Sequence, residues 1–152
     1  MAKSIRIERD YAHSPAQVWQ ALTDPQAIGA WLMQTDMELA VGTRFQLRAE
    51  PQPGWRGYVD CEILEIEPER KLRYSWQGDE KVKPMQVEWT LVPLGSGTRL
   101  TLVHSGFEGV GGWFLRMMLG SGWKKMLSSG IVPVLDAIRD GRMAELRPKF
   151  AC

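Results

Sequence analysis

The chain has few of the residue types that build metal centres and disulfide frameworks. In 152 residues it has two cysteines, Cys61 and Cys152, and two histidines, His13 and His104. Two cysteines give no disulfide framework, and two histidines far apart in the chain fall short of a zinc ligand set. We therefore expect no metal and no cofactor, and a reducing compartment, the cytoplasm.

An excess of charge of one sign is also lacking, since 19 basic and 18 acidic residues leave a net charge of +1. No run of Lys or Arg is long enough to follow a phosphate backbone, so we expect no nucleic-acid partner. No apolar run approaches a bilayer span, and the first residues lack the apolar core of a signal peptide. At this length we expect one domain over residues 1–152, with its core at about 4–140 and a tail at 141–152.

The N-terminal part of the sequence predicts a strand followed by two short helices. Residues 4–11 alternate apolar and polar side chains, as a strand with one covered face does. Ser14-Pro15 and Asp24-Pro25 each join a side chain that caps helices to a proline suited to a first helical turn. Apolar residues at helical spacing follow both pairs, so we expect helices that begin at Pro15 and Pro25.

Five later segments alternate with a period of two and predict a sheet with one face in water and one face covered. They are residues 43–49, 57–67, 71–77, 85–92 and 98–105. The turns between them are short and polar, which indicates antiparallel neighbours, and a bulge is expected near Leu64. An apolar stripe over residues 122–140 predicts a long C-terminal helix that covers the sheet and bends near Gly130 and Pro133.

Residues 108–121 are too apolar for an ordinary solvated loop, because they include Trp113, Phe114, Met117 and Met118. Two interpretations stay open at this point. The segment is either a short helix packed on the core or a mobile lid that hinges at its flanking glycines. The packed helix is favoured, because apolar stripes usually belong to the core.

This order of elements resembles the START-like helix-grip fold of the SRPBCC superfamily. Within it, the chain is similar to bacterial relatives of the activator of heat-shock protein 90 ATPase. Three segments carry the resemblance over roughly residues 4–140. They are the PxxVWxALTDP motif at 15–25 with Trp31 six residues on, VEWTL at 87–91 followed by GTRLTL at 97–102, and HSGF at 104–107 with Gly122-Trp123 opening the final helix. The implied fold is α+β, a curved antiparallel sheet of about six strands wrapped around the long helix.

The resemblance implies a cleft between sheet and helix, where members of the superfamily bind lipids, polyketides and other apolar molecules. Our leading hypothesis is therefore a module that binds a small apolar or amphipathic molecule. Eight residues are expected to line the cleft. They are Trp31, Phe45, Tyr74, Trp76, Trp89, His104, Trp123 and Met126. His104 is the expected polar anchor, and the alternative is a structural histidine bonded to a backbone carbonyl.

Two other functions stay open. The resemblance implies a co-chaperone-like role in the stress response, with a chaperone as partner, and some superfamily members are cyclases or hydrolase-like enzymes. We assign no catalytic residue, because no inward Asp or Glu accompanies His104 and a buried Cys61 thiol is inert. His13, beside a helix start, is expected at the surface. The sequence makes no prediction of oligomeric state.

Overall fold

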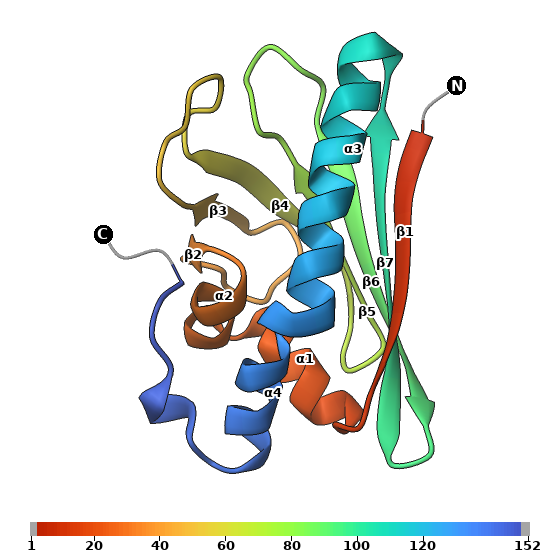
Figure 1. The fold of residues 1–152 in the computed structure, drawn as a ribbon, viewed down its shortest axis with the longest axis vertical. Coiled ribbons are helices and arrows are strands. Elements are labelled where there is room, and N and C mark those ends of the chain that lie inside the picture. Colours follow the sequence, from red (N-terminus) through yellow and green to blue (C-terminus); the bar gives the residue numbers. More distant parts are fainter. Residues whose placement is uncertain (1–2, 150–152) are drawn as a thin grey trace.

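The computed structural model describes residues 3–149 and contains one antiparallel sheet of seven strands (Figure 1). The strands are β1 (Lys3–Tyr11), β2 (Gln34–Thr35), β3 (Arg44–Arg48), β4 (Tyr58–Glu67), β5 (Lys71–Trp76), β6 (Met85–Leu94) and β7 (Gly97–Phe107). Their order across the sheet is β1-β7-β6-β5-β4-β3-β2. Strands β2 to β7 therefore follow one another as neighbours, and only β1 is paired out of sequence, beside β7.

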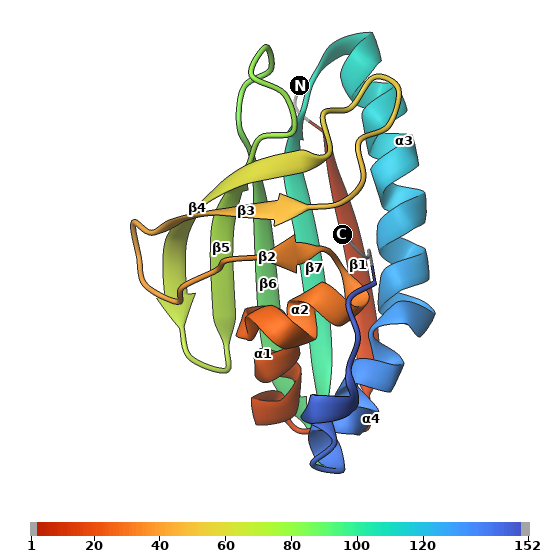
Figure 2. The ribbon, with the colours of Figure 1, turned by 90° about the vertical axis from the view of Figure 1, so that its left-hand side faces the viewer.

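Helices cover one face of this curled sheet. They are α1 (Pro15–Thr23), α2 (Pro25–Trp31), α3 (Gly109–Lys125), the π-helical turn η1 (Met126–Gly130), α4 (Val132–Arg139) and the 3-10 turn η2 (Met143–Glu145). The two views show α1 and α2 against one half of the sheet, while α3 runs along much of its length (Figures 1 and 2). This is the predicted helix-grip fold. Within residues 3–149, none of the helices combines the length and apolarity of a membrane span.

The caps of the first two helices are formed as predicted. The Ser14 hydroxyl accepts from the Gln17 N–H at 3.3 Å, and the Gln17 side chain accepts from the Ser14 N–H at 3.0 Å. The Asp24 carboxylate accepts from the N–H groups of Gln26 and Ala27, at 2.9 and 3.1 Å. Each cap satisfies donors that the first turn leaves free, so the chain turns at fixed points between β1, α1 and α2.

The sheet has one strand more than expected. Strand β2 pairs Gln34 with Arg48 and Thr35 with Leu47 at the outer edge of β3. Two residues are too few to show the alternation that predicts a strand, so no pattern in the sequence indicates β2. The expected bulge is confirmed, because the β4–β5 register shifts between Ile63 and Glu65.

The final helical segment begins earlier than predicted. Residues 108–121 are the N-cap and the first turns of α3, so the segment is a helix. The favoured interpretation, a helix packed on the core, holds for Leu115 and Leu119. It does not hold for Trp113, Phe114, Met117 and Met118, which are all exposed. One side of α3 meets the sheet, and these four side chains lie on the other. The predicted bend is confirmed as the π turn η1, where the Ile131 N–H donates to the Met126 carbonyl at 2.8 Å.

The expectation for His13 is also wrong. Its side chain is buried, and Nε2 lies 2.8 Å from Oδ1 of Asp136 on α4. The His13 carbonyl accepts from the Thr98 hydroxyl at 2.8 Å. His13 therefore links the β1–α1 connection to α4 and β7. Both contacts join parts of the chain that are far apart in sequence, so no local pattern predicts them.

The start of β7 passes so close to the end of β1 that only glycine fits at position 97. A Cβ on Gly97 would clash with the Tyr11 carbonyl oxygen, which is backbone and unable to move aside. We expect Gly97→Ala to lower the free energy of unfolding by about 2 kcal/mol or more, measured by urea denaturation. The matched control is Gly122→Ala in α3, where a Cβ meets nothing within 4 Å. It should raise stability by about 0.5–1 kcal/mol, and equal losses in both variants would contradict the argument.

Candidate functional site

Seven of the eight predicted site residues meet in the interior, between the sheet and the helices. They are Trp31, Phe45, Tyr74, Trp76, Trp89, His104 and Trp123, called the aromatic cluster below. Ring centroids are 6.1 Å apart for Trp31–Trp89, 5.5 Å for Trp89–Trp123 and 5.0 Å for Trp76–His104. These are edge-on contacts, the arrangement that aromatic quadrupoles favour. The cluster joins β5, β6 and β7 to α2 and α3.

Several polar atoms of the cluster form hydrogen bonds within the protein. The Trp31 indole N–H donates to the Ala21 carbonyl at 2.8 Å, and the Trp89 indole N–H donates to the Tyr74 hydroxyl at 3.0 Å. Burial raises the pKa of Tyr74 well above its ordinary value, and the nearby Cys61 adds to this effect. Tyr74 is therefore a neutral, buried phenol. These bonds give the rings a structural role, and their contact with a ligand stays a prediction.

His104 lies at the centre of this interior and is completely buried. Its Nδ1 accepts from the Trp123 indole N–H at 3.1 Å, which places the proton of the neutral ring on Nε2. Among residues 3–149, Nε2 has no hydrogen-bond partner. Burial lowers the pKa of His104 to about 3, so the ring is neutral at physiological pH. The residue is a structural histidine, but its partner is an indole rather than the expected backbone carbonyl.

The interior leaves little free space. The largest gap beside the cluster is bordered by Leu22, Ile28, Trp31, Leu32, Met37, Leu47, Tyr74 and Trp89, and it is too narrow to admit a water molecule. Large rings fill the volume that the helix-grip fold leaves between sheet and helix. A ligand therefore needs another opening or a movement of these side chains.

Such an opening lies where η1 faces α2 and the loop after β3. It is a groove of about 460 Å³, a size typical of small-molecule sites. Its walls are Leu32, Met33, Ala49, Trp55, Gly122, Lys125, Met126, Ser129, Gly130 and Lys149. Met126 is the one predicted site residue that lines it. Leu32 borders both the groove and the narrow inner gap, and so stands between them.

Two lysines give the groove a positive end. Lys125 comes from the last turn of α3 and Lys149 from the C-terminal segment, whose N–H donates to the Gly29 carbonyl at 2.8 Å. The pKa of Lys149 lies below its ordinary value, mainly through burial and further through the charge of Lys125. Both ammonium groups border the groove, and their charge would attract an anion there.

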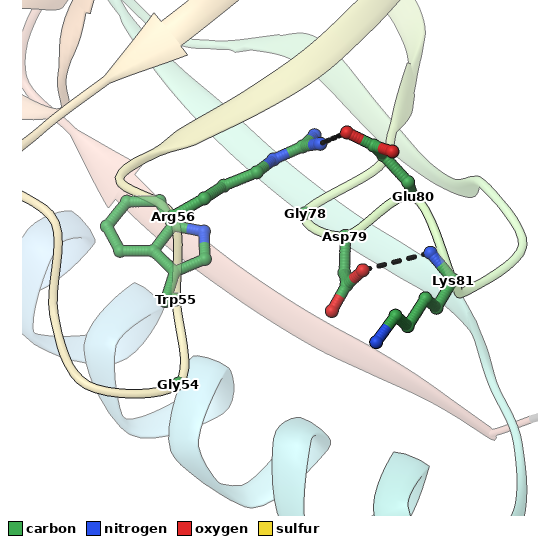
Figure 3. A pocket seen from close by; sticks show the side chains of 7 residues that line it. All are labelled: Gly54, Trp55, Arg56, Gly78, Asp79, Glu80 and Lys81. Atoms are coloured by element: carbon green, nitrogen blue, oxygen red, sulfur yellow. Dashed lines mark hydrogen bonds and ion pairs between the residues drawn. The ribbon is translucent and has the colours of Figure 1, made fainter.

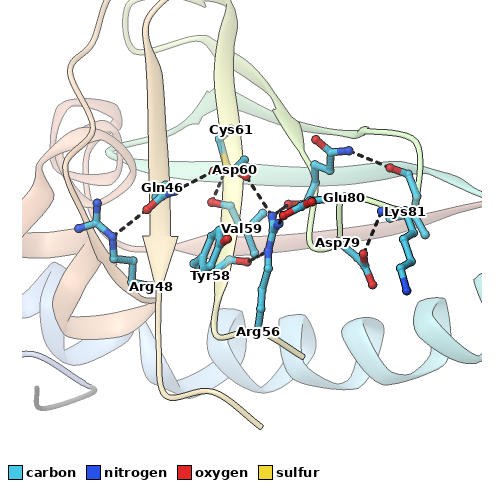
Figure 4. A network of polar contacts seen from close by, with 12 residues as sticks. Gln46, Arg48, Arg56, Tyr58, Val59, Asp60, Cys61, Asp79, Glu80 and Lys81 are labelled. Carbon is cyan, nitrogen blue, oxygen red and sulfur yellow. Dashed lines mark hydrogen bonds and ion pairs between the residues drawn. The ribbon is translucent and has the colours of Figure 1, made fainter. Parts of the chain in front are cut away.

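The position of Trp55 in the groove depends on a polar network around Arg56. The Arg56 guanidinium pairs with Asp60 at 3.0 Å and Glu80 at 3.6 Å, and it lies 4.0 Å from the centre of the Tyr58 ring. Figure 4 shows these contacts between β4 and the loop after β5. Beside them is a surface pocket of about 290 Å³, in which charged groups face one another (Figure 3). We assign this network the role of fixing the loop that carries Trp55.

Within the described part of the chain, the enzymatic alternative has no carboxylate beside His104, and the His–carboxylate pair of His13 and Asp136 joins the β1–α1 connection to α4. Between residues 3 and 149, no carboxylate is buried, and no group of three His, Cys, Asp or Glu side chains could hold a metal ion. Cys61 is buried, which raises the pKa of its thiol and keeps it protonated, while Cys152 lies outside the described residues. A neutral, enclosed His104 alone is a poor general acid or base.

Fold and site together define the class of protein, a START-like helix-grip domain. The chain belongs to the family of activator of Hsp90 ATPase homolog 1-like proteins, whose sequence model matches residues 12–135. The resemblance that the sequence suggested is thereby confirmed.

Solved structures agree with this assignment. MLL2253 from Mesorhizobium loti is 31% identical with a TM-score of 0.77, over 91% of this chain and 98% of that one. CalU16 from Micromonospora echinospora is 30% identical with a TM-score of 0.69, over 95% and 86%. The Aha1 dimer from Colwellia psychrerythraea is 18% identical with a TM-score of 0.71, over 92% and 98%, and at that identity shows the fold alone. No curated protein matches the chain.

Sequence reasoning did not find most of the groove. Trp55 sits in the loop after β3, whose path no periodicity describes, and Lys149 lies in the segment expected to be a tail. The sequence does show Lys125 as a cation in the last turn of a helix. That pattern usually complements the helix dipole, so it does not by itself indicate a binding site. The groove arises because segments distant in sequence meet at η1.

The buried His104 makes stability depend on pH. Below its ordinary pKa of 6.5 the unfolded chain takes up a proton that the folded ring, with its pKa near 3, does not. Stability is therefore fully present above pH 6.5 and falls by about 1.4 kcal/mol per pH unit below it. Between pH 6.5 and 5.0 we expect a loss of about 2 kcal/mol from this group, measured by urea denaturation.

The control is His104→Gln, whose amide oxygen can still accept from Trp123 and which does not titrate. The two proteins differ at this position alone, so the difference between their curves reports on His104. We expect the loss between pH 6.5 and 5.0 to be about 2 kcal/mol smaller in the variant. Parallel curves for the two proteins would show that His104 is not buried in its neutral form.

Proposed function

We propose that this protein binds a small, mostly apolar molecule with an anionic group in the groove beside η1. The observation that carries the proposal is the combination, in one opening of about 460 Å³, of apolar walls with two lysines. A pocket with a large apolar lining and a few convergent polar groups is the usual form of a small-molecule site. Family membership agrees with this function, since the helix-grip fold supports ligand binding.

Apolar side chains supply most of the binding free energy in this proposal. Leu32, Met33, Trp55 and Met126 present hydrocarbon, sulfur and an indole face to the groove. Covering about 200 Å² of apolar ligand surface contributes about 5 kcal/mol, less the cost of immobilising the ligand. Unbranched Met side chains adapt to ligands of different outline, which favours a class of molecules over a single one.

The aromatic cluster forms the rigid support behind the groove. Trp31 precedes Leu32 in the chain, and its carbonyl oxygen lies 3.9 Å from the Cβ position of Gly130. The cluster thus holds α2 and η1, the two sides of the groove, at a fixed separation. In this proposal Met126 contacts the ligand, and the seven rings position the elements that bind it.

Binding is tested with decanoate and its matched alcohol, 1-decanol, by thermal shift and titration calorimetry. A ligand present at 100 times its Kd adds about 2.7 kcal/mol, or roughly 5–11 °C in Tm at this size. We expect Ala49→Trp, which fills the groove, to abolish the shift. Val92→Trp, at an exposed site on β6, is the matched control and should keep it. An unchanged shift in Ala49→Trp would place the site elsewhere, and no binding of either probe would refute the proposal.

The charge requirement has its own test. We expect decanoate to bind more tightly than 1-decanol. Lys125→Glu should weaken decanoate about 1.4-fold to fivefold and leave the alcohol unaffected, since a partly exposed ion pair contributes about 0.2–1 kcal/mol. Lys83→Glu makes the same change of net charge outside the groove and should leave both affinities unaltered. Equal effects of the two substitutions would indicate long-range charge rather than a contact.

A chaperone-partner role is the second candidate, and the family match favours it. In this alternative the outer surface binds the partner and the groove is not needed. Binding of purified heat-shock protein 90 that persists in Ala49→Trp would support the second candidate. Absence of binding in both the unsubstituted protein and the variant would refute it.

A further inference from the structure

Helix α3 carries an apolar face that the rest of the described structure leaves largely exposed. Five side chains, called the α3 stripe below, follow one another at alternating intervals of three residues and one residue. They are Val110, Trp113, Phe114, Met117 and Met118. Their exposed fractions are 76, 46, 61, 58 and 68%. This spacing places them on one side of the helix.

The fold does not need the α3 stripe, because other residues of the helix do the packing. Leu115 and Leu119 pack against the core, Trp123 is buried, and Gly120 approaches Ile5 of β1. Large apolar side chains that are left together in water mark an interaction surface. The stripe is therefore a second candidate site, separate from the groove, and the inference from it does not depend on the proposed ligand.

Charges at the two ends of the stripe indicate what covers it. Glu108 lies exposed at the N-cap, Lys124 and Lys125 lie exposed in the last turn, and residues 109–135 contain no acidic side chain. Among residues 3–149, no side chain forms an ion pair with Glu108 or Lys124. The other charged residue of α3, the partly buried Arg116, lies by its spacing on the side of the helix away from the stripe. The face with the stripe thus presents an anion, apolar side chains and cations in sequence along one direction. A copy of the same surface, turned end to end, is its electrostatic complement.

We propose that the α3 stripe is a self-association surface on which α3 of a second copy packs antiparallel about a twofold axis. We place the twofold axis at the level of residue 116. A residue that precedes position 116 in one copy then lies at the level of the residue that follows position 116 by the same number in the other copy. Glu108 then lies opposite Lys124, Phe114 opposite Met118, and the small residue Gly111 opposite Ser121. Each contact occurs twice, as a twofold interface requires. Sulfur–aromatic contacts form its centre, and the ion pairs lie at its rim.

The size of this surface sets the strength of the association. From Glu108 to Lys124 the helix rises about 24 Å, at about 1.5 Å per residue. One helix pair of this length belongs to the small interfaces, below about 1,200 Å². We therefore expect a reversible dimer with a Kd on the order of micromolar rather than a permanent one.

The test is sedimentation velocity of the full chain over a concentration series, from about 1 μM to 1 mM. We expect the sedimentation coefficient to rise with concentration, and Phe114→Asp to remain a monomer throughout. Val92→Asp introduces the same charge at an exposed apolar position on β6 and should dimerise normally. A circular dichroism spectrum like that of the unsubstituted protein confirms that each variant is folded. A monomer at every concentration, or a dimer that persists in Phe114→Asp, overturns the proposal.

Charge exchange tests the antiparallel register. Glu108→Lys and Lys124→Glu should each weaken the dimer, on the order of tenfold, because each turns two attractive contacts into repulsive ones. The double variant restores opposite charges and should recover most of the affinity. Failure of that rescue refutes this register.

A lipid surface is the main competing occupant of an apolar helix face that ends in lysines. It is examined by flotation of the protein with vesicles of phosphatidylcholine and phosphatidylserine. A monomeric protein that floats with these vesicles, and no longer does so as Phe114→Asp, would assign the stripe to lipid and overturn self-association. Phe114→Asp should bind decanoate with the same affinity as the unsubstituted protein does. Failure of the proposed ligand site and failure of the proposed dimer can therefore be distinguished.

Discussion

The contact on which the rest of the structure depends is the bond between Trp123 and His104, at the centre of the aromatic cluster. Trp123 is the residue of α3 that is fully buried, and its indole reaches β7 through His104 while its ring lies against Trp89 on β6. One side chain thus holds the long helix against two central strands. Because the imidazole is buried, it is neutral in the folded state. Its bond to Trp123, its packing and the pH dependence of stability therefore all require the neutral ring.

Because large rings fill the interior, the candidate site lies nearer to the surface than the cleft between sheet and helix. A helix-grip fold can hold a ligand between sheet and helix, but here the gap beside Trp31 and Tyr74 does not admit water. The opening that exists is where α3 gives way to the π turn η1, and where Gly130 leaves room near Trp31. Departures from regular helix often lie at functional sites, and this one borders the apolar groove. The groove and the closed interior are separated by Leu32.

Helix α3 has two faces with different roles. Its inner residues fix the fold, its last turn supplies Lys125 to the groove, and its outer face carries the α3 stripe. Since the groove is at the C-terminal end of the helix and the stripe covers its earlier turns, substitutions in the stripe and in the groove test the two proposals independently. The glycines within α3 lower its intrinsic helix propensity, so packing against β1 and β7 is what keeps this segment helical.

The sequence by itself determined the features that depend on neighbours along the chain. Alternation predicted the long strands, Ser14 and Asp24 predicted the helix starts, and the motifs at 15–25 and 87–107 predicted the family. Only the tertiary structure decided which apolar residues are covered. Trp123 and Trp113 both lie on α3, yet one is buried and the other is half exposed, because burial depends on which face meets the sheet. The groove and the role of His13 were decided in the same way, since both arise where distant segments meet.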